Sequence, residues 1–284
     1  MSASFSPVVK AQEVVQSGNF SVRQLDLGRL DGYIAPVMMF DHYRMSGPTF
    51  APHPHAGLSA VTYVFEDSAG AIHNRDSLGH DVDVQPGEIL WTQAGSGVVH
   101  DEYPAKNGAA VHGLQLFVNL SRKNKFIAPR MLHGRSSAIP VWKDASGNRV
   151  RILSGALEEL RAAIEPAEPF DFFEAQLQSA WTYVARKGRS VMVYILSGAV
   201  TVAASAAKKS LHEGEAAGVR IEKSDEPLVL TPKGRAHLLL LSGEDPNEPV
   251  AAQGPFIMNT EEEIAEAFDR YRAGKMGRLA AVSR

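Results

Sequence analysis

The sequence contains no cysteine, which excludes disulfide bonds, thiolate nucleophiles and zinc sites built from cysteine. It also has no run of about 18 or more apolar residues, so no membrane-spanning helix is expected. The first residues lack the basic and apolar blocks of a secretory signal. Because a chain without cysteine fits a reducing compartment, we expect a cytoplasmic protein.

An excess of charge of one sign is absent as well. The formal net charge is -3 and the sequence pI is about 6.4. Neither value gives the electrostatic field of a dedicated nucleic-acid binder, so direct contact with nucleic acid is not expected. The densest basic stretch in the middle of the chain holds Arg122, Lys123 and Lys125. It is predicted to be a solvated loop that follows a strand.

The pattern that fills most of the chain is that of β-structure. Across residues 33–120, short runs rich in β-branched and aromatic residues alternate with turn signals, as in Ala60–Phe65 and Gly113–Leu120. The second half repeats this style, and 284 residues suggest about two domains. We predict an all-β fold of two β-barrel or jelly-roll sandwich domains. The boundary is placed in the loop after Ser121, which gives domains of residues 1–135 and 136–284.

One segment near the C-terminus follows a helical pattern instead. Thr260 is a good N-cap and Glu263 stands three residues later, which makes a capping box. The apolar residues that follow are three or four positions apart and form one stripe: Ile264, Ala267, Phe268 and Tyr271. The sequence therefore predicts an amphipathic helix over about 261–273, and its stripe must bury against one of the two β-domains.

The strongest chemical signal is Pro52-His53-Pro54-His55. In an extended backbone, positions i and i+2 face the same side, so both imidazoles can reach one ion through bonds of about 2.1 Å. The two prolines remove N–H donors and favour an edge strand or a strand entry. Taken alone, however, a His-x-His pair on an exposed strand is more often a pair of surface histidines.

A second pair of ligand types is His100 and Glu102, again two positions apart. A β-barrel can bring the two pairs together, and three imidazoles with one carboxylate suit a first-row divalent ion. His73, His80 and His112 belong to the same domain, so a different trio could serve. The remaining histidines have no partner at ligand spacing and are predicted to be surface or hydrogen-bonded core residues: His42, His133, His212 and His237.

A set of motifs occurs in a fixed order along the chain: His53–Gly57, Val61–Val64, Arg75–Gly79, Pro86-Gly87, Trp91-Thr92, Ala94–Glu102, Gly113–Leu120 and Gly254–Ile264. Together they resemble the pirin family of the cupin superfamily, from about Asp41 to Gly277. The resemblance implies a bicupin with metal in the N-terminal barrel only. It also implies that His53, His55, His100 and Glu102 hold one divalent transition metal, with Fe(II) favoured over Mn, Co, Ni, Cu or Zn.

The resemblance implies a function as well. Pirin-like proteins include quercetin 2,3-dioxygenases, oxidoreductases that open a flavonol ring, and Glu102 could accept the proton of such an aromatic substrate. The alternatives are a non-enzymatic, redox-responsive metal protein that regulates a partner protein, and a cupin for another small molecule. One departure bears on the choice, because the family's Arg-Gly-Phe-Glu is Ala56-Gly57-Leu58-Ser59 here. Three side chains beside the expected ligands are therefore changed, which bears on pocket shape and substrate.

Overall fold

The computed structural model describes residues 3–30 and 32–280. Its regular structure is dominated by β-strands, which confirms the predicted all-β class. The chain forms two compact units. The first unit takes in residues 13–23, 37–137 and the C-terminal stretch from residue 246, and the second takes in the N-terminal stretch to residue 12, 24–36 and 138–245.

The first unit is a sandwich of two sheets whose buried side chains form a common core. The seven-stranded sheet has the order β13 (Arg130–Gly134), β10 (Ile89–Gln93), β7 (Leu58–Val64), β12 (Val111–Asn119), β5 (Val37–Met45), β4 (Phe20–Gln24) and β3 (Gln12–Ser17). The four-stranded sheet has the order β6 (His53–His55), β11 (Val98–Pro104), β8 (Ile72–Asp76) and β9 (Asp81–Val84). As the two prolines predict, β6 is an edge strand.

The second unit is also a sandwich of two sheets around a shared core. The larger sheet has the order β1 (Ala3–Phe5), β23 (Glu215–Ile221), β20 (Arg189–Ser197), β25 (Ala236–Glu244), β18 (Phe170–Leu177), β15 (Arg149–Ser154) and β14 (Val141–Lys143), with β2 (Val9–Lys10) also on β23. The smaller has the order β19 (Trp181–Ala185), β24 (Glu226–Pro232), β21 (Ala199–Ala204) and β22 (Ala207–His212). Short elements complete the chain: η1 (Leu27–Leu30), η2 (Arg122–Asn124), η3 (Ser136–Ala138) and the hairpin of β16 (Ala156–Leu157) and β17 (Leu160–Arg161).

Each end of the chain belongs to the unit that is formed mainly by the other half of the sequence. The units divide at several points along the chain, and one of these divisions falls between Ser137 and Ala138. However, β1 pairs with β23 of the second unit, and the C-terminal segment belongs to the first unit. A division into residues 1–135 and 136–284 would therefore cut through both units. The sequence does not reveal the pairings of the chain ends, because they join distant segments and leave no local pattern.

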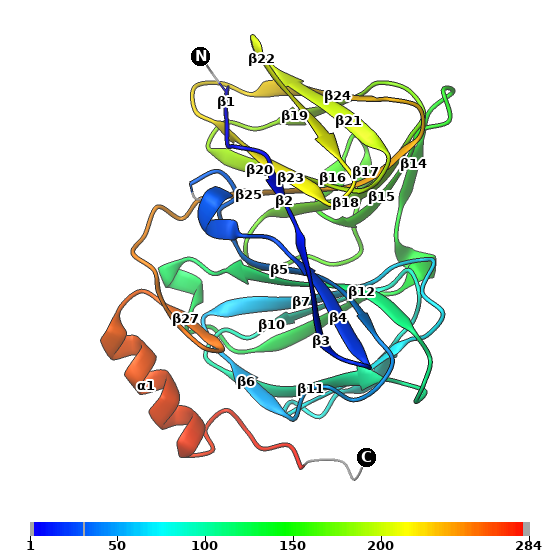
Figure 1. Cartoon of the computed structure of the whole chain (residues 1–284). Coiled ribbons are helices and arrows are strands. Elements are labelled where there is room, and N and C mark those ends of the chain that lie inside the picture. Colours follow the sequence, from blue (N-terminus) through cyan, green and yellow to red (C-terminus); the bar gives the residue numbers. More distant parts are fainter. Residues whose placement is uncertain (1–2, 31, 281–284) are drawn as a thin grey trace. The chain divides into compact units, whose positions relative to one another are not determined.

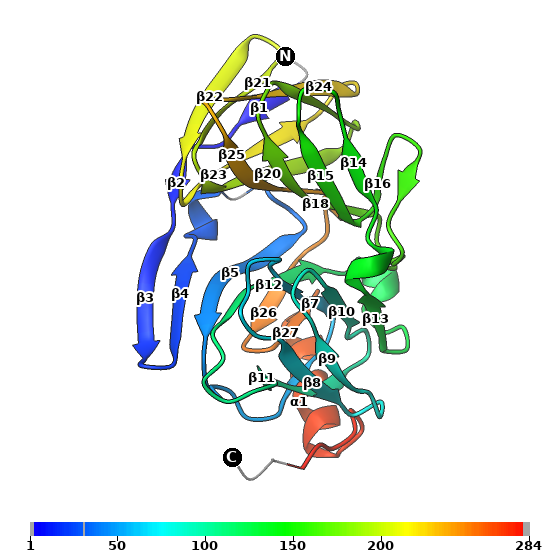
Figure 2. The same cartoon turned by 90° about the vertical axis from the view of Figure 1, so that its right-hand side faces the viewer.

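The C-terminal segment covers the outside of the histidine strands. It consists of a hairpin of β26 (Ala251–Gln253) and β27 (Phe256–Met258), followed by α1 (Glu261–Arg272), and Figures 1 and 2 show α1 beside β27. The predicted capping box between Thr260 and Glu263 is present. The buried stripe of α1 packs in one cluster with Ala56 and Val99, which neighbour the expected ligands. No helix in the described residues is long and apolar enough to cross a membrane.

Candidate metal centre

The pairing of β6 with β11 brings three histidines together. His100 lies directly opposite His53 in the register, and the period of two places His55 on the same face as His53. The ring centroids are 4.6 Å apart for His53 and His100, and 4.9 Å apart for the other two pairs. One nitrogen from each ring lies within 4.8 Å of the others, so the trio could hold a metal ion.

Glu102 follows His100 at the next same-face position of β11 and lines the same cavity as the three histidines. Its Oε1 atom accepts a hydrogen bond of 2.7 Å from the Thr62 hydroxyl on β7. In the described part of the chain, the convergent group of ligand atoms comprises the three imidazoles without this carboxylate. Glu102 therefore stands beside the trio, where the sequence places it, and its role as a ligand remains a prediction.

Burial sets the charge of these groups. It lowers the pKa of His55 to about 3, an effect to which His53 adds and which the Pro255 carbonyl opposes. Burial, followed by the neighbouring His55 and His53, also lowers the pKa of His100 well below its usual value. Both rings are thus uncharged at neutral pH and keep a lone pair for a metal. Burial raises the pKa of Glu102 to about 7, although the bond from Thr62 acts in the opposite direction.

Backbone carbonyls orient two of the rings. The Nδ1 atom of His53 lies 3.0 Å from the Ala51 carbonyl, and that of His55 lies 3.3 Å from the Pro255 carbonyl. Since a carbonyl accepts only from N–H, each ring directs a proton on Nδ1 toward its carbonyl, and the uncharged ring of His55 then presents an unprotonated Nε2. This is the tautomer that a metal ligand needs, and such outer contacts fix ligand orientation.

The cavity beside the histidines is small and mostly apolar. Its volume is about 180 Å³. Much of its lining is aromatic or methionine: Phe20, Met39, Tyr43, Met45, Phe50 and Phe117. The other lining residues are polar or ionisable: Asp41, His53, His55, His100, Glu102 and Gln115. Burial and the nearby Glu102 raise the pKa of Tyr43 above its ordinary value, so its phenol stays protonated. Such a site suits a compact, largely apolar ligand with a few polar groups.

The prediction for Lys125 is wrong. It was expected in a solvated loop, but its side chain is completely buried, while Lys123 is exposed. The Lys125 ammonium donates to the Gly57 carbonyl at 3.0 Å, to Asn119 Oδ1 at 2.6 Å and to the Ile257 carbonyl at 2.8 Å. It thus ties the turn after the ligand strand to β27. A lysine in a polar stretch carries no local signal of burial, because its acceptors come from distant segments.

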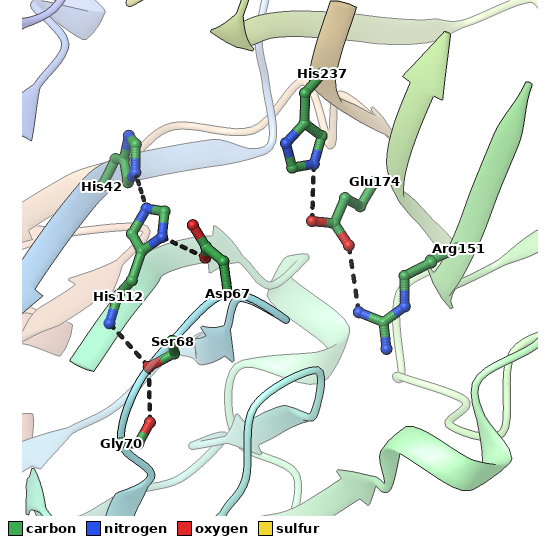
Figure 3. Close-up of polar contacts among 8 residues, drawn as sticks. All are labelled: His42, Asp67, Ser68, Gly70, His112, Arg151, Glu174 and His237. Carbon is green, nitrogen blue, oxygen red and sulfur yellow. Dashed lines mark hydrogen bonds and ion pairs between the residues drawn. The ribbon is translucent and has the colours of Figure 1, made fainter. Parts of the chain in front are cut away.

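The alternative histidines form separate contacts. His73 lies between Asp81 and Asp83, at 3.0 and 2.7 Å, and His80 contacts Asp76 at 2.7 Å. In Figure 3, His112 joins the buried His42 at 2.6 Å between their Nε2 atoms and Asp67 at 2.6 Å. Among the described residues, none of these histidines belongs to the convergent trio.

The histidines predicted to be surface or core residues also have hydrogen-bond partners. His133 contacts Glu88 at 2.8 Å, and the exposed His212 contacts Glu215 at 3.2 Å. His237 contacts Glu174 at 2.9 Å, and Figure 3 shows that the same buried carboxylate also meets Arg151. These pairings agree with the structural roles expected from the sequence.

Comparison with known proteins points to one family. Residues 19–118 match the pirin family and residues 173–277 match the pirin C-terminal cupin domain. Pirin of Mus musculus is 33% identical over 267 residues, which cover 90% of this chain and 87% of the mouse protein. A Pseudomonas aeruginosa protein, provisionally named a quercetin 2,3-dioxygenase, is 30% identical over 253 residues, which cover 84% and 86% of the two chains.

A solved structure supports the same fold. The crystal structure of quercetin 2,3-dioxygenase from Acinetobacter baumannii aligns with a TM-score of 0.84 and 24% identity, over 99% of this chain and 100% of the other. The two sandwich units therefore form a bicupin, as expected.

Proposed function

This chain belongs to the pirin family, and we propose that it is a metal-dependent dioxygenase of the quercetin 2,3-dioxygenase type. In this proposal His53, His55, His100 and Glu102 hold Fe(II). The observation that carries it is the convergence of three imidazoles at a mostly apolar cavity that is also lined by the half-buried carboxylate of Glu102. The name of the Pseudomonas relative supports the choice of a flavonol as substrate.

The donor set fits such an ion. Burial keeps two of the imidazoles, His55 and His100, uncharged. Backbone carbonyls accept from Nδ1 of His53 and His55, which turns Nε2 of each ring toward the site, and a carboxylate lies beside the three rings. Imidazole with carboxylate suits first-row divalent ions. When bound, the metal would supply Lewis-acid and redox chemistry toward a phenolic oxygen and dioxygen.

The protein's own groups would bind and deprotonate the substrate. The rings of Phe50 and Phe117 line the cavity and offer apolar faces to a planar aromatic molecule, which excludes water from the reacting end. Thr62 donates to Oε1 of Glu102, so Oε2 is the atom left for the metal or for a substrate hydroxyl proton. Burial raises the pKa of Glu102 to about 7 in the metal-free site, and a bound cation would lower it and keep the group a carboxylate, the form that accepts a proton.

The departures from the family motif lie away from the cavity wall. Ala56, Leu58 and Ser59 are all buried, and none of the three lines the cavity. Ala56 packs with the C-terminal segment, and Leu58 packs with Ile257. These departures would favour the regulatory alternative if they changed the cavity, and their position outside its lining weakens that alternative. The cavity and its ligands favour the dioxygenase.

The test is a reaction with defined metal. Protein purified without a histidine tag is loaded with Fe(II) under anaerobic conditions, and oxygen and quercetin are added. Carbon monoxide release is expected, together with about one metal per chain. His53→Ala and His100→Ala should each abolish stoichiometric metal and product, whereas His212→Ala, at an exposed position outside the cavity, should retain both. The absence of product with Fe, Mn, Co, Ni and Cu would refute the activity, and full metal occupancy in His53→Ala would refute the ligand assignment.

A further inference from the structure

Three polar side chains form a row across one wall of the metal cavity. Gln115 on β12 lies opposite Thr62 on β7 and, on its other side, opposite Asp41 on β5. The Thr62 Oγ1 atom is 2.7 Å from Glu102 Oε1. It is 2.9 Å from the side-chain amide atom of Gln115 that the structure assigns as Oε1. Gln115 and Asp41 both line the cavity.

The hydroxyl of Thr62 cannot donate to both neighbours, because it carries a single hydrogen. A Glu102 that holds a metal is a carboxylate and can only accept, so this hydrogen belongs to Glu102. The atom of Gln115 next to Thr62 must then be the donor, Nε2. The amide oxygen and nitrogen are nearly indistinguishable in shape, and their assignment follows from the hydrogen-bond network.

We infer that Gln115 is a specificity-determining residue that turns its carbonyl oxygen toward the bound ligand and selects for an aromatic hydroxyl. In this arrangement Gln115 Nε2 donates to Thr62, and Thr62 donates to Glu102. The remaining Oε1 of Gln115 accepts a hydrogen bond from the ligand. The Asp41 carboxylate adds negative charge to the same wall, and a methoxy or carbonyl group placed against Gln115 would leave its amide oxygen without a donor. The inference rests on the proposed function, because it requires Glu102 to be a metal ligand.

Zinc-loaded full-length protein and two small phenols provide the test. Catechol and 2-methoxyphenol both keep one hydroxyl for the metal, and the second oxygen carries a hydrogen in the first and a methyl group in the second, so the change of their affinity ratio between protein variants reports the hydrogen bond to that oxygen. The ratio of their dissociation constants is measured by calorimetry in the unaltered protein and in Gln115→Leu. Because one hydrogen bond is at stake, the preference for catechol should fall by about fivefold to tenfold in the variant. Gln85→Leu, at an exposed site outside the cavity, should leave the ratio unchanged.

Variants of Thr62 test the hydrogen-bond chain itself. Thr62→Val releases the amide of Gln115 and should lower the catechol preference, while Thr62→Ser keeps the hydroxyl and should restore it. In selectively labelled, zinc-loaded protein, the side-chain amide protons of Gln115 should exchange slowly with solvent, and Thr62→Val should remove this protection.

The possible outcomes separate this inference from the proposed function. Bound zinc with an unchanged ratio in Gln115→Leu would overturn the inference alone. Failure of the unaltered protein to bind zinc would overturn the proposed metal site and the inference with it.

Discussion

Replacing Lys125 with methionine should destabilise the first unit by about 2–4 kcal/mol. The substitution keeps the length of the side chain and removes three hydrogen bonds from a buried ammonium group. The Gly57 carbonyl has a second, longer contact from the Leu120 amide at 3.4 Å, so the main losses fall on Asn119 and Ile257. A buried acceptor without its donor costs about 1–3 kcal/mol. Methionine offsets part of this loss, because no ammonium group has to be desolvated.

Hydrogen exchange followed by mass spectrometry can read this change in each unit separately. In Lys125→Met, peptides from β12 and β27 should exchange faster by the factor that 2–4 kcal/mol implies, about 30-fold to 900-fold. Peptides from β20 in the second unit serve as the internal reference. Lys123→Met is the matched control, since this lysine is exposed two residues away and should change stability by less than about 0.5 kcal/mol.

The substitution should also weaken metal binding, because Lys125 holds the Ile257 carbonyl close to the ligand strand. The Pro255 carbonyl that orients His55 belongs to the same segment. A decrease in zinc affinity of about tenfold is expected, at the lower end of the effect of lost outer contacts on metal sites. Equal stability and equal zinc affinity in Lys125→Met and Lys123→Met would refute the reasoning.

Further predictions concern protons, sterics and the helix cap. Zinc binding should strengthen as pH rises to about 7 and then level off, because Glu102 must lose its proton to bind the ion. Calorimetry in buffers of different ionisation enthalpy should show that protons are released on zinc binding, and Glu102→Gln should reduce this release. In the metal-free fold, the raised pKa of Glu102 lowers stability as pH rises from about 4.5 to about 7, whereas the lowered pKa values of His55 and His100 raise it, so stability should rise more steeply with pH in Glu102→Gln than in the unaltered protein. Gly57→Ala should lower the free energy of unfolding in urea by at least about 3 kcal/mol, because φ is +75° and a Cβ would lie 2.0 Å from the Ile257 carbonyl oxygen. Gly79→Ala, where φ is +94° and the space around a Cβ is open, should lower it by about 1–2 kcal/mol. Thr260→Ala should cost about 1 kcal/mol and accelerate amide exchange in α1.

The features that could be predicted from the sequence depend on local spacing. The period of two predicts that His53 and His55 share a face, and the structure places them so. The capping box predicts a helix over 261–273, and the observed helix ends one residue earlier. Its apolar stripe is buried at Ile264 and Ala267, whereas Tyr271 in the last turn is 37% exposed.

The features that could not be predicted depend on pairings between distant segments. The choice of His100 over the other histidines follows from the register of β11 against β6, which only the folded sheet defines. The assignment of the chain ends to their units follows from β1 pairing with β23 and from the parallel bridge between Ala56 and Phe256. Neither pairing has a counterpart in hydrophobic periodicity, since a strand's pattern reports its buried face and not its partner.

The C-terminal segment is therefore part of the candidate metal centre, although it lies about 200 residues from the histidine strand. The Pro255 carbonyl fixes the proton of His55 on Nδ1, and the bridge at Phe256 and the bond from Lys125 to Ile257 hold that carbonyl in place. A histidine that could rotate or change tautomer would present a protonated nitrogen to the ion for part of the time, and metal affinity would fall accordingly. Two chains with the same ligands can thus differ in affinity through this segment alone.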